Sequence, residues 1–174
     1  EERKKIESKR QQTKKMMQFN PNSVPVQPIV SLTPFIGGKP WIKARVVDKG
    51  EIRTWNKPTS TGKLFSCTLV DETASIRLTF FNEGVEQYFP VVNNGSVYYF
   101  NGFSIKNSNR RFNSVANDYE LSADRDAQVH IARDAASAAL PTQRYNFVPI
   151  HVLAHKEKGS TVDVLAVVVA VGEP

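Results

Sequence analysis

Hydrophobic and polar residues alternate along several stretches in the first two thirds of the chain. In SIRLTFF (residues 75–81), Ile76, Leu78 and Phe80 fall on one face of an extended strand, and Arg77 and Phe81 fall on the other. The first face is typical of a buried core. The second is expected to face solvent, yet it carries a guanidinium and a phenyl ring.

The same alternation predicts five strands. A short helix is expected in EGVEQYF (83–89) and ends before Pro90, and NKPTSTG (56–62) is expected to be a loop. Five strands with one short helix between the third and fourth predict an all-β protein with an OB-fold, a five-stranded Greek-key barrel. The predicted strands are WIKARVVDKG continuing as EIRTW after a bend near Gly50, LFSCTLV (64–70), ASIRLTFF (74–81), SVYYFNGFSIK (96–106) and RFNSVANDYEL (111–121).

Composition shifts divide the chain into four segments. Residues 1–28 form a basic arm and a proline-containing linker, and residues 29–122 form the OB-fold. Residues 123–140 are expected to be a second linker. Residues 141–174 are expected to be the truncated start of a second domain. Within them, the β-forming residues 160–171 predict an orphan strand that packs on the first domain or pairs with a neighbouring molecule.

The 174 residues carry a net charge of +6. The excess lies in the first 15 residues and in 31–122, which is consistent with a polyanionic partner or with a merely solvated surface. We expect the arm to add salt-sensitive, sequence-blind affinity. The chain shows neither a membrane-spanning run nor a secretion signal, and its one cysteine, Cys67, excludes an internal disulfide.

Cations and aromatic rings occur together at three places on or near the predicted strands. Rings can stack on unpaired bases, and cations can neutralise phosphates, so this pattern favours a groove for single-stranded nucleic acid. The alternative for each ring is core packing. The candidate stacking rings are Trp55, Phe81 and Phe112; the candidate phosphate contacts are Arg53, Lys57, Lys63, Arg77, Lys106 and Arg111; and Asn82 and Glu83 are candidates for base edges.

Catalytic and metal chemistry find little support in the sequence. His151 and His155 have no third ligand nearby, and Ser66-Cys67 lies within a predicted strand without a nucleophile elbow. No cofactor, metal or enzymatic activity is therefore expected. Two other classes stay open on the residues alone: an OB-fold that captures a partner peptide, and an OB domain appended to an enzyme.

Several blocks over residues 29–122 resemble the first central DNA-binding OB-fold of the replication protein A large-subunit family. They are SLTPF, WIKARVVDKGEIRTWN, GKLFSCTLVDE, IRLTFFNE, YFP, VYYF and NDYEL. The resemblance implies a non-catalytic, nuclear protein that binds single-stranded DNA in replication, repair and recombination. It also implies a heterotrimer formed through regions outside this chain. Any preference for G-rich or telomeric strands is left open.

The resemblance also assigns roles to residues. Phe81 and Phe112 fall on the two base-stacking positions, and residues 56–62 resemble a loop that closes over DNA. Residues 141–174 resemble the entry and first strand of a second OB-fold. No zinc is expected in this region. The other positions that match DNA-contacting ones are Arg53, Trp55, Lys63, Arg77, Asn82, Glu83, Lys106 and Glu120.

Overall fold

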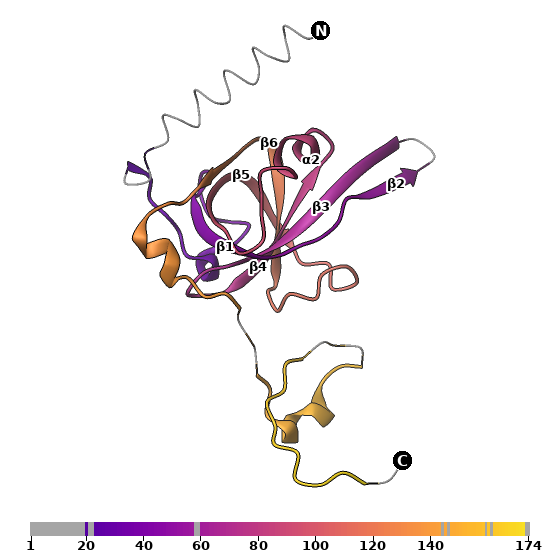
Figure 1. The fold of residues 1–174 in the computed structure, drawn as a ribbon. Coiled ribbons are helices and arrows are strands. Elements are labelled where there is room, and N and C mark those ends of the chain that lie inside the picture. The colour runs from indigo at the N-terminus through magenta and orange to yellow at the C-terminus, as the bar shows by residue number, and fades with distance from the viewer. Residues whose placement is uncertain are drawn as a thin grey trace, which may run out of the picture.

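The computed structural model describes residues 20, 23–57, 60–143, 145, 147–158, 160 and 162–172 (Figure 1). The basic arm, residues 1–19, therefore lies outside the described residues. The elements are β1 (Ile42–Lys49), β2 (Arg53–Lys57), β3 (Ser60–Val70), β4 (Ser75–Phe81), α2 (Glu83–Tyr88), β5 (Val97–Asn107) and β6 (Tyr119–Ile131), with 3₁₀ turns η2 (Ile29–Ser31), η3 (Ala135–Ala139) and η4 (Ile150–His155).

The strands close into a barrel. They follow the order β1-β5-β6-β4-β3-β2, and β1 also pairs with β3, which joins the two sides of the sheet. The β4–β6 pair is parallel and the other pairs are antiparallel. Because β2 continues β1 after a bend at residues 50–52, the six labelled strands make a five-stranded barrel. The predicted OB-fold and the bend near Gly50 are both confirmed.

The barrel core is built from the apolar face of each strand. In β4, Ile76, Leu78 and Phe80 are buried, as the alternation predicted. Phe80 stacks on Phe65 of β3 with ring centroids 4.8 Å apart and an interplanar angle of 9°. Each such side chain contributes about 1.5–3 kcal/mol by leaving water. Helix α2 adds Val85 and Tyr88 to the same core cluster.

The last strand differs from the predicted one. The sequence placed the fifth strand at 111–121 and the end of the domain at 122, whereas β6 runs from Tyr119 to Ile131 and residues 108–118 form a loop. Charges at 124–126 made this stretch resemble a linker. They lie at the solvent side of a strand that pairs with β5 over most of its length, while Leu121 and Val129 enter the core.

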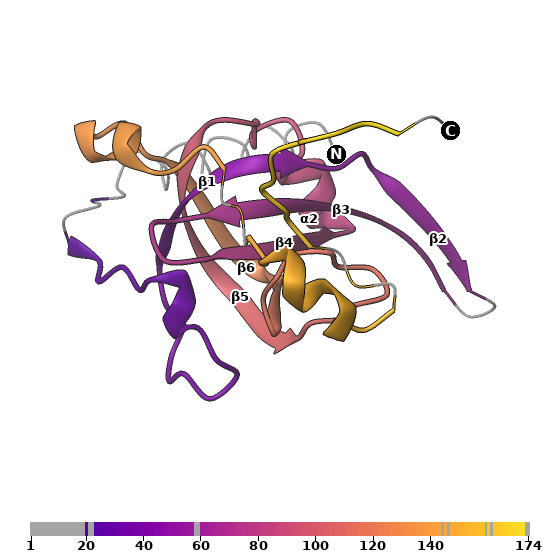
Figure 2. The ribbon, with the colours of Figure 1, turned by 90° about the horizontal axis from the view of Figure 1, so that it is seen from below.

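The predicted linker at 123–140 is also wrong, because its second half is docked on the barrel. The half-buried guanidinium of Arg45 donates hydrogen bonds to the carbonyl oxygens of Ser137 at 3.0 Å and of Leu140 at 2.9 Å. Asp134 accepts from Lys43 at 2.5 Å and from the Tyr99 hydroxyl at 3.0 Å. Satisfied carbonyls allow this 3₁₀ turn to pack on β1 without a cost for buried polar groups. Figure 2 shows η3 lying beside β1.

The predicted strand at 160–171 does not form. Its described residues have no strand pairing except a single bridge between Asp163 and Phe147, and the valines that follow are exposed. Figure 1 shows this segment apart from the barrel. A strand needs a second backbone to accept its hydrogen bonds, and residues 164–172 have no such pairing with a described segment. Self-association through this segment stays a prediction.

Candidate nucleic-acid interface

A groove of about 210 Å³ opens on the side of the barrel between two projecting elements. One is the β2–β3 hairpin and the other is the β5–β6 loop, residues 108–118, which project from the same side of the barrel in Figure 1. This loop and the bend between β1 and β2 supply most of the walls, and β3 and β4 form the floor. The groove is lined by Asp48, Gly50, Glu51, Arg53, Leu64, Ser66, Cys67, Thr68, Arg77, Phe112, Asn113, Ser114 and Val115.

The hairpin replaces most of the loop predicted at 56–62. Arg53 pairs with Leu64, Trp55 with Gly62 and Lys57 with Ser60, so the strands extend to the two residues at its tip. Those tip residues, 58–59, and the side chain of Lys57 lie outside the described part of the chain. The alternating ladder puts Arg53 and Trp55 on the same face of β2. Arg53 lines the groove, and Trp55 lies two residues further toward the hairpin tip, beyond the lining residues.

Arg77 lies on the groove floor. Its guanidinium donates a hydrogen bond to Ser66 Oγ at 2.9 Å, and Ser66 Oγ is also 2.9 Å from Thr79 Oγ1. Around Arg77, the outward face of β3 and β4 is thus polar, opposite to the buried face that carries Leu78 and Phe80. A guanidinium fixed in this way has lost part of its rotamer freedom before any anion arrives.

Trp55 and Phe81 form a pair at the hairpin side of the groove. Their ring centroids are 5.9 Å apart with an interplanar angle of 77°, an edge-to-face contact. Phe81 is 38% exposed and lies opposite Leu64, which lines the groove. Core packing, the alternative for this ring, is therefore not what the structure shows.

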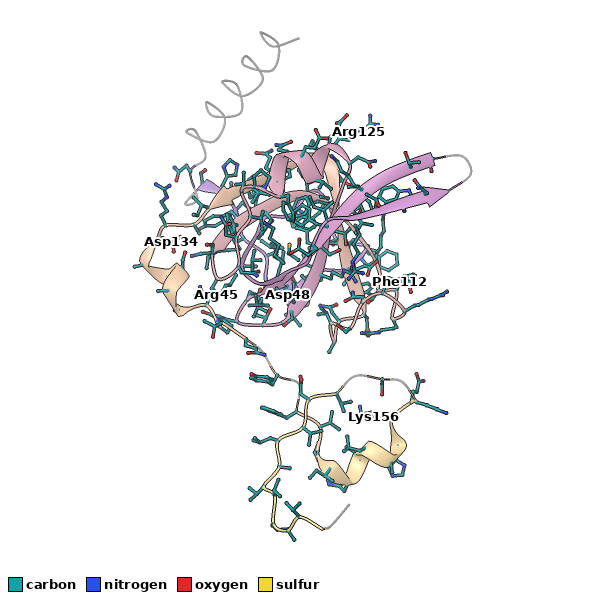
Figure 3. All side chains as sticks on the ribbon, turned by 45° about the vertical axis from the view of Figure 1, so that its right-hand side comes forward. Arg45, Asp48, Phe112, Arg125, Asp134 and Lys156 are labelled. Carbon is teal, nitrogen blue, oxygen red and sulfur yellow. The ribbon has the colours of Figure 1, made fainter. Side chains whose placement is uncertain are left out.

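Phe112 lies on the opposite wall, in the β5–β6 loop. Its side chain is 65% exposed, and the guanidinium carbon of Arg111 lies 5.4 Å from the ring centroid. Figure 3 shows Phe112 on the other side of the barrel from Arg45 and Asp134, so the groove and the docked 3₁₀ turn are separate surfaces. Phe81 and Phe112, the two rings that the resemblance assigns to base stacking, are both solvent-accessible, and neither turns into the barrel.

Other predicted contacts are already engaged within the protein. Lys63 forms an ion pair with Glu86 of α2 at 2.7 Å. Asn82 occupies the tight turn between β4 and α2 with a φ of 46°, where its Oδ1 accepts the Lys63 N–H at 3.2 Å. Asparagine tolerates this backbone conformation better than most residues. The exposed Glu83 is the first residue of α2.

Lys106 and Glu120 lie beyond the groove floor, away from the hairpin. They are cross-strand partners on β5 and β6. The β4–β6 register pairs Leu78 with Leu121, so one residue earlier Arg77 and Glu120 lie side by side. The resulting row of Arg77, Glu120 and Lys106 alternates in charge, which places an acidic side chain between two cations.

Of the residues that line the groove, sequence reasoning selected only Arg53, Arg77 and Phe112; the polar ones that it missed include Asp48, Glu51 and Asn113. Asp48 and Glu51 flank the bend at Gly50. The position of the bend was predicted, but the directions of these two side chains depend on its geometry, which the sequence does not show. Asn113 is buried inside the β5–β6 loop and hydrogen-bonds to Glu120 Oε2 at 3.1 Å. The predicted strand at 111–121 concealed it.

Cys67, His151 and His155 are the residues that the sequence raised for nucleophile or metal chemistry, and the structure describes all three. Burial raises the pKa of Cys67 to about 12, so its thiol is not a nucleophile at neutral pH. His151 and His155 lie in a 3₁₀ turn, where residues four apart do not share a face, and no group of three or more metal-ligating side chains occurs in the described part. None of the described helices is long and apolar enough to span a membrane.

Comparison with known proteins agrees with the OB-fold. A family described as an OB-fold nucleic acid binding domain matches residues 41–126. The solution structure of DNA binding domain A of S. cerevisiae replication protein A is 33% identical and superposes with a TM-score of 0.55; the match covers 64% of this chain and 97% of that one. The chain belongs to the replication protein A large-subunit family.

Two further members of the replication protein A family extend the match. The replication factor A 51 kDa subunit of Crithidia fasciculata is 62% identical over 154 residues, which is 88% of this chain and 33% of that protein. The replication protein A 70 kDa DNA-binding subunit of Mus musculus is 42% identical over 142 residues, 82% of this chain and 22% of that one. This chain thus spans a third or less of the length of these relatives.

A larger assembly of the replication protein A family also contains this fold. In the structure of a replication protein A heterotrimer bound to single-stranded DNA, one chain is 31% identical to this chain and superposes with a TM-score of 0.64. The match covers 76% of this chain and 30% of that one. The Mus musculus relative is named as a DNA-binding subunit, and the heterotrimer is named as bound to single-stranded DNA; neither name assigns a role to a groove residue.

Proposed function

We propose that this chain binds single-stranded DNA in the groove between the β2–β3 hairpin and the β5–β6 loop. The observation that carries the proposal is the meeting of Arg53, Arg77 and Phe112 in one groove, from three separate parts of the chain. Unpaired DNA offers phosphates and base faces, and the groove offers cations and an exposed ring. Stacking contributes about 1–3 kcal/mol per base in OB-folds of this type, a general value that includes this family.

Each wall of the groove contributes one stacking ring. Phe112 stacks a base from the β5–β6 loop, and Phe81 stacks another from the barrel side, supported at its edge by Trp55. Arg53 and Arg77 neutralise phosphates between them. Stacking accepts the face of any base, so the groove binds with little sequence preference.

The remaining predicted contacts act at the margins of the groove. Lys63 exchanges its Glu86 partner for a phosphate, and Lys106 and Arg111 add charge near the β5–β6 loop. Glu83 and the NH₂ group of Asn82 are placed at the helix end of the Phe81 wall to meet base edges, and Lys57 adds charge near the hairpin tip. Glu120 accepts from Asn113 and acts through the loop.

The relatives support a role in DNA replication. They are replication protein A subunits, and one structure is a heterotrimer bound to single-stranded DNA. We infer a nuclear, non-catalytic DNA-binding role in replication, repair and recombination, in which other subunits bind regions outside this chain. The peptide-capture and enzyme-appended alternatives receive no support from these names.

A salt titration tests the proposal. Fluorescence anisotropy of a labelled oligothymidine should show an affinity that falls with salt at a slope of about −0.7 per neutralised phosphate. Two arginines in the groove predict a slope of about −1.4 or steeper. A matched duplex should bind more weakly, because its bases are not available for stacking. An affinity for the single strand that is equal to that for the duplex, or insensitive to salt, contradicts the proposal.

A further inference from the structure

Asn113 is the most buried polar residue of the β5–β6 loop. Asn113 is 2% exposed, whereas the preceding residue, Phe112, is 65% exposed. A polar amide is costly to bury unless its hydrogen bonds are made. Phe112 thus faces solvent while Asn113 is buried, and the hydrogen bonds of Asn113 show which parts of the loop it connects.

The Asn113 amide bonds to three parts of the loop. Its NH₂ group donates to Ser108 Oγ at 2.9 Å, at the start of the loop, and to Glu120 Oε2 at 3.1 Å, in β6 just after the loop ends. Its Oδ1 accepts the backbone N–H of Val115 at 3.0 Å. Both donor hydrogens and the acceptor are thus used, and one residue ties the start, the middle and the end of the loop together.

A second set of bonds completes the loop around this centre. The Ser108 N–H donates to the carbonyl of Asp118 at 2.7 Å, and the Phe112 N–H donates to the carbonyl of Asn109 at 2.9 Å. Asn117 Nδ2 donates to the carbonyl of Ser75 at 2.9 Å, which attaches the loop to β4. Phe112 is not one of the buried residues of the core cluster, so its position depends mainly on the shape of the loop.

We propose that Asn113 is a positioning residue that keeps the β5–β6 loop folded so that Phe112 is presented to a DNA base. The inference rests on the proposed single-stranded DNA binding. A loop without these bonds would have to lose its conformational freedom when DNA binds, and that loss weakens affinity. With Asn113, the loop is ordered before binding. Glu120 contributes by accepting from Asn113.

A double-mutant cycle tests this role. Asn113→Ala should weaken oligothymidine binding about five- to tenfold in the parent chain, an order of magnitude set by the cost of ordering the loop. In a Phe112→Ala background the same change should alter affinity by less than about twofold, because the ring that Asn113 positions is gone. A merely structural defect would weaken both backgrounds equally, and that result overturns the inference.

Hydrogen exchange gives a readout that does not depend on DNA. The Val115 amide bonds to Asn113, so its exchange should accelerate in Asn113→Ala while amides of β3 and β4 keep their protection. Ala116→Ser, an exposed position in the same loop, is the matched control and should change neither exchange nor affinity. Unchanged Val115 exchange in Asn113→Ala would contradict the inference.

Two variants keep the outcomes separate. If Asn113→Ala does not fold, Ser108→Ala removes one of the same bonds and should give the same non-additivity with a smaller effect. If Phe112→Ala alone leaves affinity unchanged, the stacking proposal fails instead. If Phe112→Ala weakens binding and neither Asn113→Ala nor Ser108→Ala does, stacking stands and the positioning role is wrong.

Discussion

Trp55 of β2 and Phe81 of β4 meet edge to face across β3, with their ring centroids 5.9 Å apart. Gly62 of β3 makes this contact possible, since a Cβ at that position would lie 2.2 Å from Cζ2 of Trp55. No side chain fits beneath the indole. The backbone of the hairpin therefore sets where the exposed edge of the aromatic pair lies.

Gly62→Ala should displace Trp55 and weaken single-stranded DNA binding roughly tenfold, because Phe81 would lose the ring that supports it for stacking. The methyl group cannot be accommodated without moving the ring, because strand pairing fixes the backbone on both sides. Fluorescence anisotropy measures the affinity, and tryptophan emission reports the changed surroundings of Trp55. Gly37→Ala is the matched control, because a Cβ there meets nothing within 4 Å. Equal affinities for the two variants would contradict this account of the hairpin.

Arg77→Gln should lower affinity and make the salt dependence shallower by about 0.7, the value for one phosphate on a single strand. Glutamine keeps a donor near Ser66 but carries no charge, so the change tests charge rather than packing. Arg125→Gln is the control. Arg125 is an exposed residue of β6 away from the groove in Figure 3, and its loss should leave the slope within error. Equal salt slopes for Arg77→Gln and the parent chain would show that Arg77 does not neutralise a phosphate.

Arg45→Ala should lower the free energy of unfolding by about 1–3 kcal/mol without weakening DNA binding. The guanidinium donates to the carbonyl oxygens of Ser137 and Leu140 and to Gly95 O at 2.6 Å, on the side of the barrel away from the groove. Urea unfolding measures the stability and anisotropy measures the binding. Arg133→Ala, at an exposed position nearby, should change neither quantity. A loss of affinity in Arg45→Ala that matches its loss of stability would contradict the separation of the two surfaces.

The ion pair between Asp134 and Lys43 predicts that docking of the 3₁₀ turn at 135–139 weakens at low pH. The hydrogen bond from Lys43, aided by those from Tyr99 and Ser137, lowers the pKa of Asp134 to about 2. Because the folded-state pKa lies below the unfolded value of about 3.9, its stabilisation is complete above that value. It is lost as the pH falls through about 2.

The carboxylate is 36% exposed, so solvent screening limits its contribution to about 1 kcal/mol or less. Limited proteolysis within 132–140, followed between pH 5 and pH 2, measures the docking. Asp134→Asn should be cleaved faster than the parent chain at pH 5, and at pH 2 the two rates should converge. A rate difference that persists unchanged at pH 2 would exclude this ion pair as the cause.

Period-two alternation was enough to predict most of the barrel. The pattern in β4 assigned Phe80 to the core and Phe81 to solvent correctly, because a single residue step reverses the face. The bend at Gly50 was predicted for the same reason, as the alternation continued on both sides of it. Stacking candidates on such strands could therefore be selected from the sequence.

The region after residue 107 was predicted less well. Its loop is stabilised by hydrogen bonds between side chain and backbone, such as those of Asn113, and these leave no periodic signal. In β6, Arg125 and Asp126 belong to a strand whose pairing partner, β5, is distant in the sequence though adjacent in the sheet. Local composition alone therefore favoured a linker. The docked turn at 135–139 likewise depends on Arg45, some ninety residues earlier.

The central claim is that Phe81 and Phe112 stack unpaired bases from the two walls of one groove. The most direct measurement is the affinity of the Phe81→Ala/Phe112→Ala variant for oligothymidine, with circular dichroism to verify the fold. Two lost stacking contacts should weaken binding by roughly 2–6 kcal/mol, thirtyfold at the least, while the salt slope is retained. A folded double variant that binds as tightly as the parent chain would contradict the account.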